Sequence, residues 1–148
     1  MRILFVDAGN YCRSPAAEAV ARTIASKSGD ARRLVFSSAG LKDKHAGDTA
    51  DPRTIDVCGA RGYDLGGFRC REITEQDYKE SDLILAMDRD NLAQLETRRP
   101  PGSTTPMRLL LGDADVPDPY YGGEDGFTAM MNQIEEGVAQ LIVELGVR

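Results

Sequence analysis

The stretch Asp7-Ala8-Gly9-Asn10-Tyr11-Cys12-Arg13-Ser14-Pro15 decides the fold of this chain. It follows the apolar run Ile3-Leu4-Phe5-Val6, a pattern typical of a buried strand, and it leads into residues 16–21, which are rich in alanine. We therefore expect a loop between the end of a strand and the start of a helix. Gly9 and Asn10 tolerate left-handed backbone.

The same stretch contains signals for the start of the helix. Ser14 can cap the helix, and Pro15 suits its first turn. The backbone N–H groups of the loop, the helix dipole and the guanidinium of Arg13 would then converge on a site sized for phosphate. The alternative is an ordinary strand-to-helix turn with a surface arginine, because one glycine and one arginine make a weak motif.

The composition limits the class of protein. The chain has 148 residues, of which 41% are hydrophobic and 28% charged, as in ordinary globular domains. The net charge of -6 argues against nonspecific binding of nucleic acid, and no apolar run reaches the length of a membrane span. Three cysteines without metal-ligand spacing suit a reducing compartment, so we expect a cytoplasmic protein with neither metal nor other cofactor.

The hydrophobic pattern predicts alternating strands and helices in one α/β domain over residues 1–148. We expect a doubly wound domain with a central four-stranded parallel sheet, flanked by helices, and a phosphate-binding loop after the first strand. The predicted strands are residues 2–6, 34–38, 83–87 and 107–111. The predicted helices are residues 15–27, 53–61 and 124–145, with a capped turn at 74–77, a helix starting at Asp88, and a stop at Ser28-Gly29-Asp30.

The loop resembles that of the low-molecular-weight protein tyrosine phosphatases, which reads C-x5-R-[ST]-P. Here Gly9-Asn10-Tyr11-Cys12-Arg13-Ser14-Pro15 follows a buried N-terminal strand, and residues 82–91 resemble another recurrent stretch of that family. The first loop position departs from the family pattern, because Asp7 stands where the family has its nucleophilic cysteine. The resemblance implies that Arg13 is catalytic and that the loop binds the phosphate group of the substrate through Ala8, Gly9, Asn10, Tyr11, Cys12 and Ser14.

A second motif lies far along the chain. The segment Val116-Pro117-Asp118-Pro119-Tyr120-Tyr121 resembles the D-P-[YFW] loop of the same family, whose aspartate is the general acid. Pro119 restricts Asp118 to an extended conformation, and an adjacent phosphate group would favour its protonated form. The alternative is a solvated acidic loop, but the presence of the first motif in the same chain favours the catalytic role.

Residues 42–47 align with the loop that recognises the substrate ring in the family. Lys44 and His45 stand where an aromatic residue is common, and we expect His45 to be a solvated loop histidine, with contact to the substrate as the alternative. Tyr11, Tyr120 and Tyr121 are candidates for an aromatic wall around the substrate. Tyr120 and Tyr121 are also candidate phosphorylation sites.

Two positions bear on how the loop is held. Ser38 is expected at the end of its strand near Asp7, where it either orients Ser14, as the resemblance implies, or only closes the strand. Phe68 stands where the family often has a histidine that supports this serine, and it cannot form that hydrogen bond. We expect Arg71 to form a structural ion pair.

Aspartate at position 7 changes the expected chemistry. A carboxylate is a weaker nucleophile toward phosphorus than a thiolate, and it reaches about one bond further into the loop. The loop amides will also hold it firmly, so we predict a folded cradle that is filled by its own side chain. Engineered inactivation, natural loss and mimicry of an oxidised cysteine are each compatible with Asp7.

The sequence therefore supports one main hypothesis and two alternatives. The main hypothesis is a phosphatase scaffold that hydrolyses phosphotyrosine through a phosphocysteine in its cysteine form and is inactive or severely impaired with Asp7. The alternative is a non-enzymatic protein that binds phosphate or phosphotyrosine, and an arsenate reductase that uses Cys58 and Cys70 ranks lower. The expected partners are phosphotyrosine-containing proteins and inorganic oxyanions, with no nucleic acid and no membrane insertion.

Overall fold

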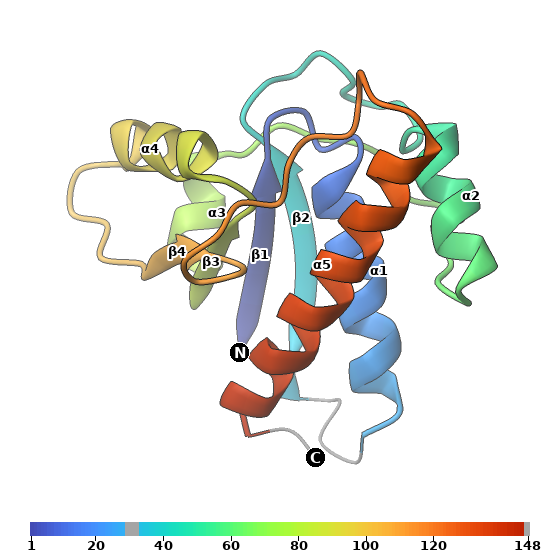
Figure 1. The fold of residues 1–148 in the computed structure, drawn as a ribbon. Helices are drawn as coiled ribbons and strands as arrows, with labels where there is room; N and C mark the ends of the chain where they lie inside the picture. The colour runs from blue at the N-terminus through green and yellow to red at the C-terminus, as the bar shows by residue number, and fades with distance from the viewer. Residues whose placement is uncertain (29–32, 147–148) are drawn as a thin grey trace.

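A computed structural model describes residues 1–28 and 33–146, so the predicted helix stop at Gly29 and Asp30 lies outside the described residues (Figure 1). Its centre is a sheet of β1 (Arg2–Asp7), β2 (Val35–Gly40), β3 (Leu83–Ala86) and β4 (Met107–Leu109). The strands are parallel and run in the order β2-β1-β3-β4. The predicted four-stranded parallel sheet is therefore confirmed.

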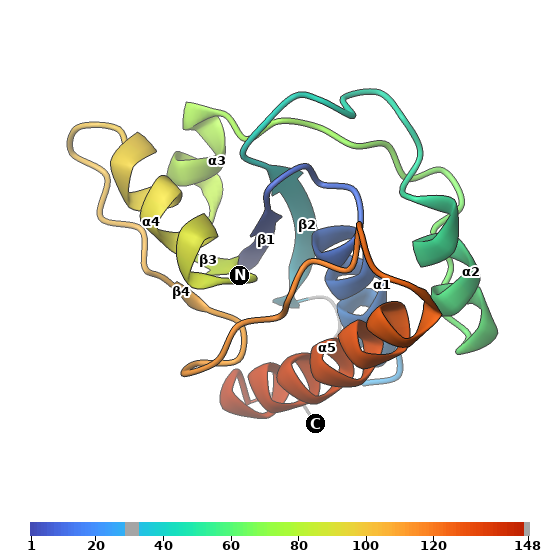
Figure 2. The ribbon, with the colours of Figure 1, turned by 45° about the horizontal axis from the view of Figure 1, so that its top comes forward.

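Helices cover both faces of this sheet (Figures 1 and 2). One face carries α1 (Arg13–Ser26), α2 (Pro52–Ala60) and α5 (Glu124–Glu144), and the other carries α3 (Glu75–Glu80) and α4 (Arg89–Arg98). The central strand β1 divides its side chains between the two layers. Ile3 and Phe5 pack with α1 and α5, whereas Leu4 and Val6 pack with α3 and α4. This two-sided burial explains why the strand reads as a continuous apolar run.

Local sequence signals explain several of the helix boundaries. Thr74 and Asp77 form the reciprocal capping box that the sequence predicts for α3. Asp88 caps α4 by accepting a hydrogen bond from the amide of Asn91. The apolar face predicted for α5 is buried from Phe127 to Ile142. The strand predicted at residues 107–111 is shorter in the structure, because the chain turns between Leu109 and Gly112.

Within the described residues, no helix combines the length and the apolar character needed to cross a membrane.

The end of β2 leaves room for the loop that follows β1. A Cβ atom on Gly40 would lie 2.6 Å from the carbonyl carbon of Gly9 and 2.7 Å from the amide nitrogen of Asn10, which real contacts do not permit. The amides of Leu41 and Lys42 donate to the carbonyls of Asp7 and Ala8, which fixes the two segments side by side. Gly40 is therefore required for this close approach of two backbones.

Gly40→Ala tests this packing. We expect it to lower the free energy of unfolding by about 1–3 kcal/mol, because the loop must shift to admit the methyl group. Gly59→Ala is the matched control: its Cβ meets open space on α2, so it should raise stability by about 0.5–1 kcal/mol. Urea denaturation of both variants measures the two effects, and equal stability of the two would contradict the account.

Candidate active site

The loop of residues 8–12 joins β1 to α1 at the carboxyl end of the sheet, as the sequence predicts (Figure 2). Asn10 adopts the left-handed conformation with φ of 56°, whereas Gly9 does not. The predicted cap is wrong: α1 begins at Arg13, Cys12 occupies the N-cap without a side-chain hydrogen bond, and Ser14 lies inside the first turn. The hydroxyl of Ser14 accepts from Asn10 Nδ2 at 2.8 Å, and its amide donates to the carboxylate of Asp7 at 2.9 Å.

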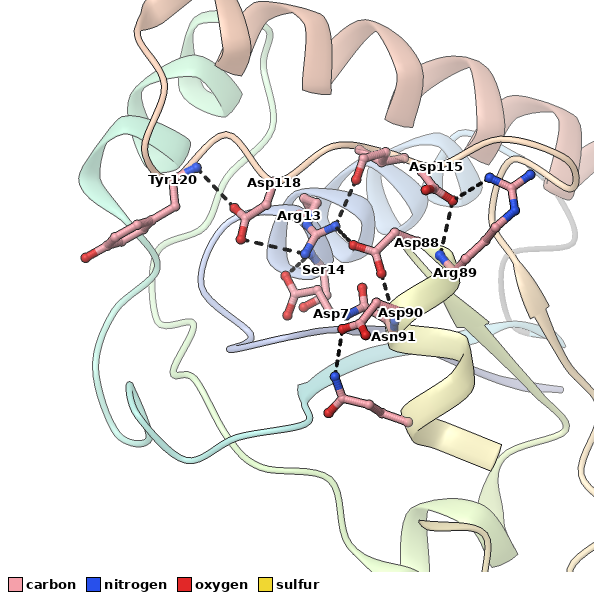
Figure 3. A network of polar contacts seen from close by, with 12 residues as sticks. Asp7, Arg13, Ser14, Asp88, Arg89, Asp90, Asn91, Asp115, Asp118 and Tyr120 are labelled. Carbon is pink, nitrogen blue, oxygen red and sulfur yellow. Dashed lines mark hydrogen bonds and ion pairs between the residues drawn. The ribbon is translucent and has the colours of Figure 1, made fainter. Parts of the chain in front are cut away.

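Asp7 lies at the floor of this loop, and both of its carboxylate oxygens accept hydrogen bonds. The amide of Asn10, in the middle of the loop, donates to Oδ1 at 2.5 Å. The amide of Ser14, in the first turn of α1, donates to Oδ2 (Figure 3). Burial raises the pKa of Asp7 above its ordinary value, while the charge of Arg13 and these hydrogen bonds limit the rise. Asp7 therefore stays protonated to a higher pH than an ordinary aspartic acid.

The prediction of a cradle filled by its own side chain holds only for the amides of Asn10 and Ser14. In the described part of the chain, the amides of Gly9, Tyr11, Cys12 and Arg13 donate to no group. Above Asp7 a pocket of about 190 Å³ remains. Consecutive unpaired N–H groups at a helix N-terminus form a site for an anion.

Arg13 is buried beside the pocket and is held in place by two segments distant in the sequence. Its Nη1 donates to Asp88 Oδ2 at 2.7 Å and to the carbonyl of Val116 at 2.8 Å. Its Nη2 lies 3.8 Å from Asp118 Oδ2 (Figure 3). The two motifs found in the sequence therefore meet at one guanidinium.

Asp118 lies at the mouth of the pocket. Its side chain is 48% exposed, and its Oδ1 accepts a hydrogen bond from the amide of Tyr120 at 3.1 Å. Asp118 and Asp7 thus both line the pocket, and both lie near Arg13 (Figure 3). A carboxylic acid in this place can donate a proton to a group bound above the loop.

A chain of polar side chains supports the loop from behind. The amide nitrogen Nδ2 of Asn10 donates to the hydroxyl groups of Ser14 and Ser38, at 2.8 and 3.0 Å, and its Oδ1 accepts from the amide of Arg71. Ser38 donates in turn to the buried carboxylate of Glu18 at 2.8 Å. Ser38 thus contacts the loop through Asn10, and Asn10 and Ser14 face this network rather than the pocket.

Neither Phe68 nor Arg71 forms a hydrogen bond with Ser14 among the contacts of the described residues. Phe68 packs against the apolar core, as its side chain requires. Arg71 pairs with Asp77 through two hydrogen bonds of 2.9 Å, as the sequence predicts.

The expectation that His45 is solvated is wrong. Its ring stacks on that of Tyr11 with centroids 3.7 Å apart and an angle of 4° between the planes, and only 16% of its side chain is exposed. His45 also covers Gly9, where a Cβ would lie 3.3 Å from its Cδ2. The prediction considered only the neighbours of His45 at residues 42–47, whereas its stacking partner Tyr11 lies far away in the sequence.

The predicted tyrosines surround the mouth of the pocket. Tyr120 is tilted toward Tyr11 at 5.9 Å, and Tyr121 contacts the edge of Tyr120 but is otherwise 92% exposed. Lys44 and Arg53 place their charges 5.6 and 5.5 Å from the ring centre of Tyr120. The mouth is therefore aromatic and cationic.

Most of the predicted site residues line one pocket. The lining consists of Asp7, Ala8, Gly9, Tyr11, Cys12, Arg13, Lys42, Lys44, His45, Asp118, Tyr120 and Tyr121. The sequence analysis missed Lys42, and it missed the roles of Asp88 and Glu18. Asp88 had a signal in the sequence, because it follows a strand at the same edge of the sheet as the loop.

Cys12 is a buried loop residue. Its Sγ lies 3.7 Å from Asp51 Oδ2, and burial raises the pKa of the thiol far above its ordinary value. Asp51 itself caps α2 and pairs with Arg53 at 2.7 Å. Although burial opposes ionisation of Asp51, the bonds from Arg53 lower its pKa. Cys12 therefore stays protonated beside a carboxylate.

Asp88→Asn tests the support of Arg13. Asparagine keeps the cap of α4 but removes the charge beside a buried guanidinium, so we expect a loss of about 2–4 kcal/mol in the free energy of unfolding. Asp90→Asn on the exposed face of α4 should change stability by less than about 0.5 kcal/mol. A similar small change in both variants would show that Arg13 does not depend on Asp88.

The raised pKa of Asp7 predicts how stability depends on pH. The native state holds this proton more tightly than the unfolded chain, so the contribution of Asp7 is present below its unfolded pKa, about 4, and declines as pH rises through the higher native value. Wild type should therefore lose stability relative to Asp7→Asn over this window. Urea denaturation of both proteins at a series of pH values measures the difference, and a constant or opposite trend would contradict the assignment.

Comparison with known proteins agrees with this geometry. The sequence profile of the family described as "Low molecular weight phosphotyrosine protein phosphatase" matches residues 2–148. The low molecular weight protein-tyrosine-phosphatase of Streptomyces coelicolor is 37% identical over 150 residues, covering 95% of this chain and 91% of its own. YfkJ of Bacillus subtilis, of the same description, is 35% identical and covers 97% and 94%.

Solved structures agree as well. The protein tyrosine phosphatase of Entamoeba histolytica, solved with Hepes in its active site, superposes with a TM-score of 0.92 at 36% identity, covering 99% of this chain and 97% of its own. The structure of YfkJ gives a TM-score of 0.91. This chain belongs to the low molecular weight phosphotyrosine protein phosphatase family.

Proposed function

We propose that this protein is a phosphotyrosine phosphatase scaffold in which Asp7 severely impairs hydrolysis. The observation that carries the proposal is the position of Asp7, whose two oxygens accept hydrogen bonds from the amides of Asn10 and Ser14 at the floor of the pocket. A carboxylate held in this way has one lone pair on each oxygen engaged, and its negative charge repels a phosphate dianion. It is therefore a poor in-line nucleophile for phosphoryl transfer.

The other parts of the reaction are present around the same pocket. The open loop amides and Nη2 of Arg13 would bind the equatorial oxygens of a phosphate group, and Asp118 would protonate the leaving phenolate. The stacked rings of Tyr11 and His45 offer a flat wall to the substrate ring. In a cysteine form, the thiolate would accept the phosphoryl group, and water would then hydrolyse the phosphocysteine with Asp118 as the base.

These features define the substrate class that we propose, a phosphotyrosine side chain on a protein. We place the protein in the cytoplasm, in keeping with three cysteines that are all unpaired in the structure.

A second candidate function is that of a non-enzymatic protein that binds phosphotyrosine, and the four open loop amides favour it. Titration with a phosphotyrosine peptide separates the two, because useful affinity in wild type supports a binding protein.

An arsenate reductase ranks below both. Such an enzyme needs reactive thiols besides the loop residue, and burial raises the pKa of Cys58 to about 12 and of Cys70 to about 11. Thiols of this kind are poor nucleophiles at neutral pH.

Asp7→Cys tests the proposed function. The loop amides that hold Asp7 would stabilise a thiolate, so we expect hydrolysis of p-nitrophenyl phosphate to rise by at least about 100-fold over wild type. Asp7→Ser is the matched control, since it removes the negative charge without adding a strong nucleophile, and it should stay near the wild-type rate.

The double variants locate the remaining roles. Adding Arg13→Lys to Asp7→Cys should abolish most of the gain, because lysine lacks the planar fork. Adding Asp118→Asn should lower turnover of a phosphotyrosine peptide by about 10²–10⁴-fold, as expected for a general acid. If Asp7→Cys folded normally and stayed inert toward both substrates, the proposal would fail.

A further inference from the structure

The charges around the pocket of about 190 Å³ are nearly balanced before any ligand binds. Asp7 and Asp118 both line the pocket, and the buried cation beside them, Arg13, is already paired with Asp88 at 2.7 Å. Lys42 and Lys44 lie at the exposed rim, where water screens their charge. A dianion that entered this pocket would meet a carboxylate at its floor.

The remaining titratable groups near Asp7 do not offset this charge. His45 stacks on Tyr11 at the rim, with Nδ1 3.8 Å from Asp48. Cys12 comes from the loop and Cys70 from the segment after α2, and burial keeps both thiols protonated. Among the described residues Asp7 has no ion-pair partner within 4.0 Å, so its charge is offset only by the more distant charge of Arg13 and by the amide hydrogen bonds.

We infer that this pocket binds a tetrahedral dianion together with one proton, which Asp7 holds. The ligand oxygens take the open amides of Gly9, Tyr11, Cys12 and Arg13, together with Nη2 of Arg13. Protonated Asp7 donates its O–H to the nearest ligand oxygen, while its other oxygen still accepts from a loop amide. The proton comes from solvent, so one proton is taken up for each dianion bound.

The physical basis is that two anions close together in a buried site cannot both stay ionised. Burial already raises the pKa of Asp7, and a bound dianion raises it further. The site therefore differs from a phosphatase site with a thiolate: its affinity for an oxyanion rises as pH falls. The inference rests on the proposed function, since it concerns the same pocket, and it names the state in which that pocket accepts a ligand.

Sulfate is the probe, because it stays a dianion throughout the range from about pH 5 to pH 8, whereas phosphate titrates within it. Isothermal titration calorimetry at constant ionic strength should show that the affinity for sulfate falls by up to about tenfold for each unit by which the pH is raised. Titrations at one pH in buffers of different ionisation enthalpy should give close to one proton taken up per sulfate. Circular dichroism confirms that the protein is folded at each pH.

Asp7→Asn is the decisive variant. Asparagine resembles the protonated acid, with one acceptor oxygen and one donor group, so it should bind sulfate with an affinity that changes less than about threefold over the range and with no proton uptake. Asp118→Asn and His45→Gln each remove another ionisable side chain that lines the pocket. Both should retain the pH dependence and the proton uptake of wild type.

Three outcomes would overturn the inference. They are undetectable sulfate binding by wild type at the lowest pH, an affinity of wild type that does not change with pH, and proton uptake that is lost in Asp118→Asn or His45→Gln but kept in Asp7→Asn. None of them depends on hydrolysis by Asp7→Cys. If the sulfate titrations fail while Asp7→Cys hydrolyses its substrates, the inference alone is refuted. If the titrations succeed while Asp7→Cys is inert, the proposed function alone is refuted.

Discussion

The structure depends on the two hydrogen bonds that join the carboxylate of Asp7 to the amides of Asn10 and Ser14. They tie the last residue of β1 to the middle of the following loop and to the first turn of α1. Between these two points Tyr11, Cys12 and Arg13 line the pocket, and their amides have no acceptor among the described residues. Backbone N–H groups at a helix N-terminus are suited to an oxyanion, and here two of them hold a carboxylate of the chain itself. The left-handed backbone of Asn10 and the bare backbone of Gly40 let the chain make this turn. The side chain of Asn10, bonded to Ser14 and Ser38, keeps the turn rigid from behind.

Arg13 connects this loop to the rest of the molecule. An unpaired buried guanidinium would destabilise the fold. Here Arg13 is paired with Asp88, which follows β3, and donates to the carbonyl of Val116. Because Val116 lies just before Asp118, the contact that stabilises Arg13 also brings the acidic loop over the pocket. Stability and the arrangement of the site therefore rest on the same contacts. None of these contacts of Arg13 involves the side chain of Asp7.

The sequence predicts this architecture well where the signal is local. The apolar runs at residues 3–6 and 83–87, the capping box of Thr74 and Asp77 and the apolar face of α5 each depend on neighbouring residues, and all are observed. The convergence of Arg13 and Asp118 was also predicted, because strands of a parallel sheet end at the same edge. Contacts set by tertiary packing were missed. His45 stacks on Tyr11, 34 residues away, and Glu18 accepts from Ser38 on a different element. The pattern of a serine before an alanine-rich helix predicts a cap at Ser14, but it cannot show that the helix already begins at Arg13 and that the Ser14 hydroxyl is bonded to Asn10.

The central claim is that the carboxylate of Asp7 is the group that the loop amides hold. The most direct measurement is a nuclear magnetic resonance titration with pH that follows the carboxyl carbon of Asp7 and the amide protons of Asn10 and Ser14 together. The account predicts that all three signals titrate with one common midpoint, above the ordinary pKa of an aspartic acid, and that the two amide protons lie far downfield when Asp7 is ionised. Amide protons that stay unchanged while the carboxyl carbon titrates, or a midpoint below the ordinary value, would contradict it.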